Sequence, residues 1–283
     1  NALVSSSCKL RNAMAFVHIL IFVQILLVPV RMLNKTDIIA SLGKGLRVLE
    51  CFGADSPRLA IAEVAEASGL DRATARRCLL TLHEFGYADY DGKFFSLTTR
   101  VLRLGMGALA ALPLPQIVQP WLAHLSEQID QSVSVAILDE TEIVYVARAA
   151  QRRVMSIGLM PGSRLPAHCT SMGRVLLAAL PENEARAVVE ASDLTPRTPH
   201  SRTDPEEIMA FIAGTRAAGH AVVDQEVELG LRSLAVPVIN SRGQTVAALN
   251  TGVAAVQQNA DEIVQLYLPA LVKVQDGLRR VLN

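Results

Sequence analysis

Three arginines occupy the six positions from 72 to 77, inside the stretch SGLDRATARRCLLTLHEFGY (residues 68–87). Apolar residues at helical spacing predict the core face of a helix here: Ala75, Cys78, Leu79 and Leu82. Arg72, Arg76 and Arg77 fall outside that face. Guanidinium groups donate hydrogen bonds to phosphates and to guanine edges. This pattern favours a nucleic-acid contact, and the alternative is a solvated helix face.

The elements around this helix form a recognisable order. An earlier helix in LAIAEVAEASG should end at Gly69, a residue that tolerates a left-handed stop. Asp71 can then cap the arginine-bearing helix by accepting from the amide of Thr74. The stretch YADYDGKFFSL surrounds Asp91-Gly92, a dipeptide typical of tight hairpins. Helix, turn, helix and hairpin predict a winged helix-turn-helix domain over residues 38–100.

DNA binding by this domain would depend on position rather than on overall charge. The chain carries 27 lysines and arginines against 27 acidic residues, and residues 41–100 carry eight of each sign. The predicted second helix of the motif would enter the major groove, and the wing tip would touch phosphate. The candidate DNA-contacting residues are Ser41, Lys44, Arg72, Thr74, Arg76, Arg77 and Lys93.

Length and composition bound the remaining possibilities. With 283 residues, 51% of them hydrophobic, the chain favours two domains. The four cysteines (Cys8, Cys51, Cys78 and Cys169) form no C-x-x-C pair, which favours a reducing, cytoplasmic compartment and argues against structural zinc. P-loop, G-x-G-x-x-G and H-E-x-x-H motifs are absent from the sequence. Neither a metal nor a cofactor is expected.

Residues 1–37 read as an N-terminal extension. The run AMAFVHILIFVQILLVPV (13–30) is apolar over about a membrane-spanning length, but it contains His18, Gln24 and Pro29. Three interpretations stay open: a leader translated by mistake, with Met32 as the true start; an amphipathic extension; or a membrane anchor.

The C-terminal part changes to a period of two. Strands are expected near 132–138 and 142–148, and another pair around 240–243. Helices are expected in TSMGRVLLAAL, DPEEIMAFIAGTRAAG and DEIVQLYLPALVKVQDGLRRVL. Prolines at 113 and 115 interrupt a helical segment, and a proline at 120 should begin or kink its second piece. We therefore expect a linker helix over 101–115 and an α+β sensor-like domain over 116–283.

Several segments together resemble the IclR-type bacterial transcriptional regulators: LGKGLRVLECF, AIAEVAEASGLDRATARRCLLTL, LPAHCTSMGRVLLAALP, TDPEEI and VVDQEVELGLRSLAVPV. The likeness covers nearly all of residues 38–283, and the first 34 residues have no counterpart. Within the family, the chain looks most like the PcaR, PcaU and PobR branch, which governs the β-ketoadipate pathway. The resemblance implies a homodimer or homotetramer that reads a palindromic operator. It also implies a GAF/PAS-like effector-binding domain with an antiparallel sheet.

The resemblance further implies where an effector binds. Family members hold small carboxylates on main-chain amides at the start of the helix after L-P-x-H, here Ser171 and Met172. A helix N-terminus is in any case a ready anion site. Gly252 stands where serine is common, which implies a roomier pocket and a larger acid. Arg148 and Arg174 are candidates to form ion pairs with a second carboxylate of the effector. The candidate effector-binding residues are Arg148, His168, Ser171, Met172, Arg174, Asp224, Ser233, Asn250 and Gly252.

Alternatives remain for individual residues and for the whole protein. Arg174 could be a surface residue, and Asp224 could pair with Arg232. Adjacent His168 and Cys169 could suggest a nucleophile and base, but neighbouring side chains in an extended segment diverge, so an enzyme is not expected. The expected function is a ligand-responsive regulator of aromatic-acid catabolism genes that senses a small aromatic or dicarboxylic acid. A regulator responding to another small carboxylate and a membrane-tethered sensor are the alternatives.

Overall fold

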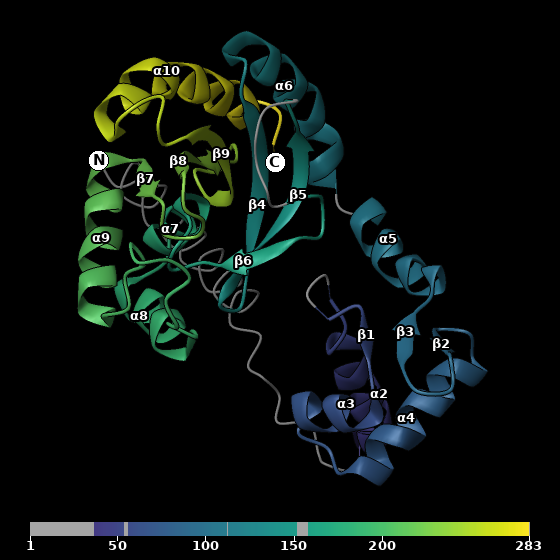
Figure 1. Ribbon diagram of the computed structural model, residues 1–283. Coiled ribbons are helices and arrows are strands. Elements are labelled where there is room, and N and C mark those ends of the chain that lie inside the picture. The colour runs from purple at the N-terminus through teal and green to yellow at the C-terminus, as the bar shows by residue number, and fades with distance from the viewer. Residues whose placement is uncertain (1–36, 54–55, 112, 152–157, 283) are drawn as a thin grey trace, which may run out of the picture. The chain divides into compact units, whose positions relative to one another are not determined.

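The computed structural model describes residues 37–53, 56–111, 113–151 and 158–282 (Figure 1). The three interpretations of the N-terminal extension fall almost entirely on residues outside this part. None of the helices in the described residues combines the length and the apolar composition that a membrane span requires. The chain divides into two compact units between Arg103 and Leu104, and each unit is taken by itself below.

The N-terminal unit is a winged helix-turn-helix, as the sequence predicted. Helices α2 (Ala40–Glu50), α3 (Ile61–Ser68) and α4 (Arg72–Glu84) precede a small antiparallel sheet in the order β1-β3-β2. Its strands are β1 (Arg58–Leu59), β2 (Ala88–Tyr90) and β3 (Phe95–Leu97). The core joins all three helices to the wing and contains Val48, Val64, Ala75, Leu79, Ala88 and Phe95.

The turns of this unit form for the local reasons that the sequence suggested. Gly69 ends α3 in the left-handed region, with φ 64°. The Asp71 carboxylate accepts from the Thr74 amide at 2.9 Å and caps α4. At the wing, the Asp91 carboxylate accepts from the amides of Lys93 at 3.0 Å and Phe94 at 2.8 Å. Both expected caps are therefore confirmed.

The connecting segment is helical through most of its length. A short 3-10 turn, η2 (Thr99–Val101), leads into α5 (Leu102–Ala111), and α6 (Pro113–Ile129) follows. The break lies near Pro113, as expected, whereas Pro120 lies inside α6 and begins no new helix. Leu114 already packs against the core of the C-terminal unit, so that unit takes in residues that the sequence assigned to the linker.

A six-stranded antiparallel sheet forms the centre of the C-terminal unit, in the order β6-β5-β4-β9-β8-β7. The two predicted strand pairs are confirmed as the hairpins β4–β5 and β8–β9. Short edge strands that the sequence did not predict extend the sheet on both sides. The strands are β4 (Ser132–Asp139), β5 (Glu142–Ala149), β6 (Arg164–Pro166), β7 (Ala221–Asp224), β8 (Leu231–Ile239) and β9 (Thr245–Ala254).

Helices cover both faces of this sheet (Figure 1). On one face α6 packs together with α10 (Ala260–Arg279) over a core that includes Leu122, Leu249 and Leu271. On the other face lie α7 (Ser171–Ala178), α8 (Glu182–Ala191) and α9 (Pro205–Ala218). The architecture is the expected α+β arrangement. Helix α7 lies directly on the sheet, and all eight of its residues are buried.

Gly173 fixes how closely α7 can lie on the segment before it. A Cβ atom at this position would overlap the backbone carbonyl of Ala167, which cannot rotate away as a flexible side chain could. We expect Gly173→Ala to lower the free energy of unfolding by about 1 to 3 kcal/mol, because α7 must shift. Urea unfolding monitored by circular dichroism measures this change.

Gly214→Ala in α9 is the matched control. A Cβ atom there meets nothing within 4 Å, so alanine should add about 0.5 to 1 kcal/mol through helix propensity. Unchanged stability of Gly173→Ala would contradict the close packing of α7.

Candidate nucleic-acid interface and effector pocket

The exposed face of α4 is cationic. Ala75 and Leu79 are fully buried, whereas Arg72, Arg76 and Arg77 are exposed. Among the ion pairs formed by the described residues, none involves these three arginines. The guanidinium groups are therefore displayed outward, in an arrangement suited to phosphate and base contacts.

A groove between α2 and α4 brings four of the predicted DNA-contacting residues together. Ser41 and Lys44 contribute from α2, and Thr74 and Arg77 contribute from α4. The pKa of Asp71 at the same helix start is lowered, first by a hydrogen bond from the Thr74 hydroxyl and then by one from its amide. Asp71 thus stays ionised and keeps the first turn of α4 capped.

The wing carries Lys93 and a second cation that the sequence did not single out. The ammonium of Lys93 lies 4.8 Å from the ring centroid of Phe94, and the guanidinium of Arg58 lies 5.1 Å from it. Arg58 also pairs with Asp91. Arg58 was missed because the two-residue strand β1 that carries it has no pattern of its own.

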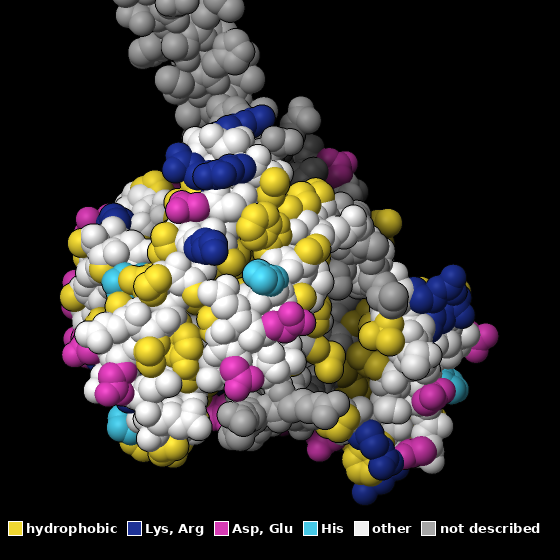
Figure 2. Space-filling view, turned by 90° about the horizontal axis from the view of Figure 1, so that it is seen from above, with side chains coloured by type: hydrophobic (Ala, Val, Ile, Leu, Met, Phe, Trp, Pro, Cys, Tyr) yellow, Lys and Arg dark blue, Asp and Glu magenta, His cyan; other side chains and the backbone are white. Residues whose placement is uncertain are grey.

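Charge is local rather than general on the surface. On the face of the molecule in Figure 2, basic and acidic side chains are interspersed, with hydrophobic side chains in small groups between them. This agrees with a formal net charge of zero. Attraction to a polyanion would therefore come from short-range contacts of α4 and the wing.

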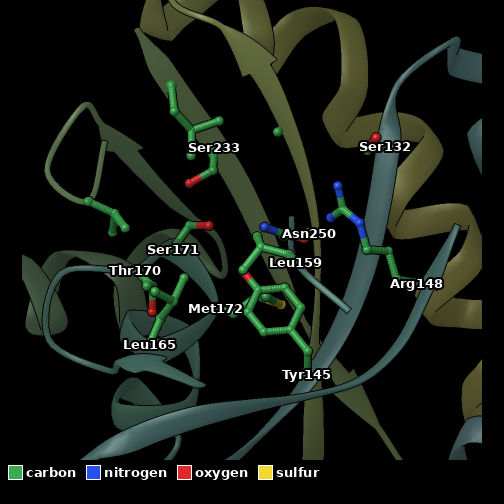
Figure 3. A pocket seen from close by; sticks show the side chains of 13 residues that line it. Ser132, Tyr145, Arg148, Leu159, Leu165, Thr170, Ser171, Met172, Ser233 and Asn250 are labelled. Atoms are coloured by element: carbon green, nitrogen blue, oxygen red, sulfur yellow. The ribbon is translucent and has the colours of Figure 1, made fainter. Parts of the chain in front are cut away.

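The second candidate site is a pocket between the first turn of α7 and the sheet (Figure 3). Thr170 caps α7 by accepting from the amide of Gly173 at 3.0 Å, which leaves the amides of Ser171 and Met172 at the free start of the helix. Both residues line the pocket, and the Ser171 hydroxyl is buried without a hydrogen-bond partner among the described residues. In Figure 3 this hydroxyl points toward the middle of the pocket.

The sheet presents two neighbouring rows of polar positions to α7. One row pairs Arg148, Ser134 and Asn250 across β5, β4 and β9, and the Arg148 guanidinium donates to the Ser134 hydroxyl at 2.9 Å. The other row pairs Ser132, Gly252 and Ser233 across β4, β9 and β8. Four of the predicted effector-binding residues in these rows line the pocket: Arg148, Ser233, Asn250 and Gly252.

Tyr145 joins the site through a β-bulge. The β4–β5 register shifts between Val135 and Ala136, so that Ala136 pairs with Tyr145 while Val135 pairs with Ala147. Tyr145 therefore reaches the same face as Arg148 although the two residues are three positions apart. Burial raises the pKa of Tyr145 to about 12, so its phenol stays protonated, and burial lowers the pKa of Arg148.

Arg174 requires a correction, because it is neither a surface residue nor a lining residue of the pocket. Its side chain is 1% exposed, and it donates to the Glu226 carboxylate at 2.7 Å and to the His168 carbonyl at 3.1 Å. The guanidinium also lies 5.1 Å from the ring centroid of Phe211. The guanidinium group is occupied by these contacts within the protein, so it is not placed to pair with a second carboxylate of an effector.

Asp224 and His168 also lie outside the pocket lining. Asp224 pairs with Arg232 at 2.7 Å, which was the structural alternative for this residue. The His168 side chain is buried, and its pKa is lowered first by desolvation and then by the charge of Arg174. Neither residue lines the pocket, so neither is placed to contact an effector directly.

The neighbouring Cys169 has the chemistry of a packed thiol. Burial raises its pKa to about 11, whereas a nucleophilic cysteine needs a lowered one. Its sulfur lies 3.7 Å from the Pro166 carbonyl. In the described part of the chain, no cluster of three or more potential metal ligands occurs.

The pocket is smaller than the glycine at 252 had suggested. It encloses about 30 Å³, room for about two water molecules, whereas a cavity that admits benzene measures roughly 150 Å³. An aromatic acid can enter only if part of the lining moves. The sequence could not reveal this, because cavity volume depends on how distant segments pack.

Comparison with known proteins assigns both units. The family description "Bacterial transcriptional regulator IclR C-terminal" matches residues 106–277, and "IclR helix-turn-helix domain" matches residues 41–92. The chain belongs to the IclR family of bacterial transcriptional regulators. It therefore has a DNA-binding unit and an effector-binding unit, in that order.

Two relatives of this IclR-family regulator carry functional names. The chain is 42% identical to the Pca regulon regulatory protein of Pseudomonas putida over 86% of its own length and 84% of that protein. It is 38% identical to the p-hydroxybenzoate hydroxylase transcriptional activator of Acinetobacter baylyi, over 88% and 94%. The expected PcaR and PobR branch of the family is therefore confirmed.

A solved structure resembles the C-terminal unit. It is a double mutant of the PobR inducer-binding domain from Acinetobacter, in complex with 3-hydroxybenzoic acid. It is 33% identical, has a TM-score of 0.56, and covers 59% of this chain and 98% of its own.

We expect Arg76→Ala in this regulator to weaken operator binding by about 1 to 3 kcal/mol and to relax the preference for one base, if Arg76 contacts guanine. Fluorescence anisotropy with the operator and its single-base variants measures both effects. Arg280→Ala removes the same charge from an exposed position after α10 and should change neither. Wild-type affinity together with wild-type base preference in Arg76→Ala would remove Arg76 from the interface.

Proposed function

We propose that this IclR-family regulator senses a small aromatic acid and controls genes of aromatic-acid catabolism. The observation that carries the proposal is the pocket itself, in which the positive start of α7 faces a row of polar side chains ending in Arg148. A carboxylate at the amides of Ser171 and Met172 would gain charge-assisted hydrogen bonds. The names of the two relatives, which concern the Pca regulon and p-hydroxybenzoate hydroxylase, support an aromatic effector.

The pocket also offers partners for a ring substituent. Tyr145 and Asn250 can exchange hydrogen bonds with a phenolic hydroxyl, and Arg148 can bind a hydroxyl or a second carboxylate. A hydroxybenzoate therefore suits the site, and so does a linear dicarboxylate. The second candidate is accordingly a regulator of the same family that responds to another small carboxylate.

The DNA-binding unit would read a palindromic operator as part of a homodimer or homotetramer, in the cytoplasm where the operator lies. Half-sites about one helical turn apart would follow from paired recognition helices. Effector binding would shift the geometry of the paired units. Regulation would therefore depend on the coupling free energy between effector binding and operator binding. Catalysis has no part in this proposal, because the thiol of Cys169 is buried and protonated.

A thermal-shift screen tests the effector class. The acids are protocatechuate, 4-hydroxybenzoate, β-ketoadipate and cis,cis-muconate, and the reference is the same buffer without any of these acids. A binder at 100 times its dissociation constant should stabilise the protein by about 2.7 kcal/mol. Stabilisation by none of the four would remove this effector class.

We expect Arg148→Ala to raise the dissociation constant of the effector by roughly tenfold to a hundredfold, since a charge-assisted hydrogen bond contributes about 1.5 to 3 kcal/mol. Operator affinity without effector should stay unchanged. Calorimetry and anisotropy measure the two quantities. Arg164→Ala is the matched control, because Arg164 pairs with Asp139 and Glu142 on the exposed edge of the same sheet. A normal effector response in Arg148→Ala would exclude Arg148 from the site.

A further inference from the structure

The effector pocket and a larger surface cleft share a lining residue. Val227 lines the pocket of about 30 Å³, and it also lines an outer cleft of about 600 Å³. The outer cleft lies among surface segments that include Thr141, Asp193 and Arg197. Val227 is half-buried and packs against the core that contains α7. Among the described residues, it is the one that lines both cavities.

Several other lining residues are held in place by their neighbours. Asn250 stands on a strand that is paired on both sides, and Ser132 and Arg148 are each paired with one neighbouring strand. The start of α7 is held against Ala167, with no room for even a methyl group at Gly173. An effector that needs roughly 150 Å³ must make its room where the lining can move. The outer cleft leaves that freedom on the side of Val227.

The residue before Val227 is fixed by a buried charge cluster. One oxygen of the Glu226 carboxylate accepts from Arg174 at 2.7 Å, and the other accepts from Arg202 at 2.8 Å. The Glu226 side chain is fully buried. A buried carboxylate without a partner would lower the free energy of unfolding. Glu226 therefore cannot lose its ion pairs with both arginines without destabilising the unit.

Hydroxyl groups hold the backbone at the same place. Thr198 donates to the Gln225 carbonyl at 2.6 Å, and Ser201 donates to the Glu226 carbonyl at 2.7 Å. Gln225 takes a φ of 59°, which marks the start of a tight turn from β7 to β8. The turn is thus anchored at Gln225 and Glu226, directly before Val227.

We propose that Val227 is the residue that sets the size limit of the effector. It forms the partition between the pocket and the outer cleft, and a bound acid makes its room by displacing this side chain outward while Glu226 stays in place. The proposal rests on the proposed function, since it concerns acids held at the start of α7. It names the class more closely: acids with one ring displace the Val227 side chain outward, and acids with a ring and a longer side chain extend past it into the outer cleft.

The experiment compares two acids across a set of Val227 variants. Calorimetry gives dissociation constants for 4-hydroxybenzoate and for the longer 4-hydroxycinnamate. In Val227→Ala we expect the preference between them to shift at least tenfold toward the longer acid, because truncation joins the pocket to the cleft. In Val227→Phe we expect both acids to bind at least tenfold more weakly, because a larger partition has to move.

Val188→Ala is the matched control. Val188 lies on α8 and packs against the same core without lining the pocket, so the same truncation there should leave the preference within twofold of the wild type. Thermal melting and operator affinity establish that each variant is folded. If Val227→Ala does not fold, the affinities of Val227→Phe for the two acids still test the proposal.

The outcomes separate this proposal from the function on which it rests. A wild type that binds 4-hydroxybenzoate, with an unchanged preference in Val227→Ala and normal binding in Val227→Phe, overturns the role of Val227 and leaves the effector class standing. A wild type that binds neither acid, nor any acid of the earlier screen, overturns both. A shifted preference in Val227→Ala alone, with Val188→Ala unchanged, supports the partition.

Discussion

The effector-binding unit depends on how closely the first turn of α7 lies on the central sheet. Gly173 contributes by letting this turn lie against the segment that precedes it, because any side chain there would meet the Ala167 backbone. The approach brings the unpaired amides of a helix start against polar positions of β4, β5 and β9. A partial positive charge thus faces a small pocket, where electrostatic interactions are stronger than in bulk water.

A charge cluster in which Arg174 and Glu226 are buried and Arg202 and Glu207 are partly exposed supports the geometry of this cavity. Two arginines and two glutamates balance formally, and the carboxylate of Glu226 bonds through both oxygens. Such clusters are weak evidence for stability, since desolvation offsets much of the attraction. Their directional bonds do fix one arrangement. Here they connect the second turn of α7 to the turn that forms a pocket wall.

The DNA-binding unit works with a modest charge. Residues 41–100 contain eight basic and eight acidic residues, yet three of the arginines lie on the exposed face of α4. Long-range attraction to DNA is therefore small, and affinity would come from contacts made after docking. The Asp71 cap and the Asp91 turn place these cations by using acidic side chains for local backbone hydrogen bonds.

The sequence by itself determined the elements whose causes are local: the caps at Asp71 and Gly69, the cationic face of α4, the two large hairpins, and the helix start at Ser171. It did not determine which side chains share the cavity. Tyr145 enters through a bulge, which reverses the face that simple alternation would assign. Arg174 leaves the site because Glu226, 52 residues away, captures it. Cavity volume, strand register and buried ion pairs depend on contacts between distant segments, and only the tertiary structure fixes those.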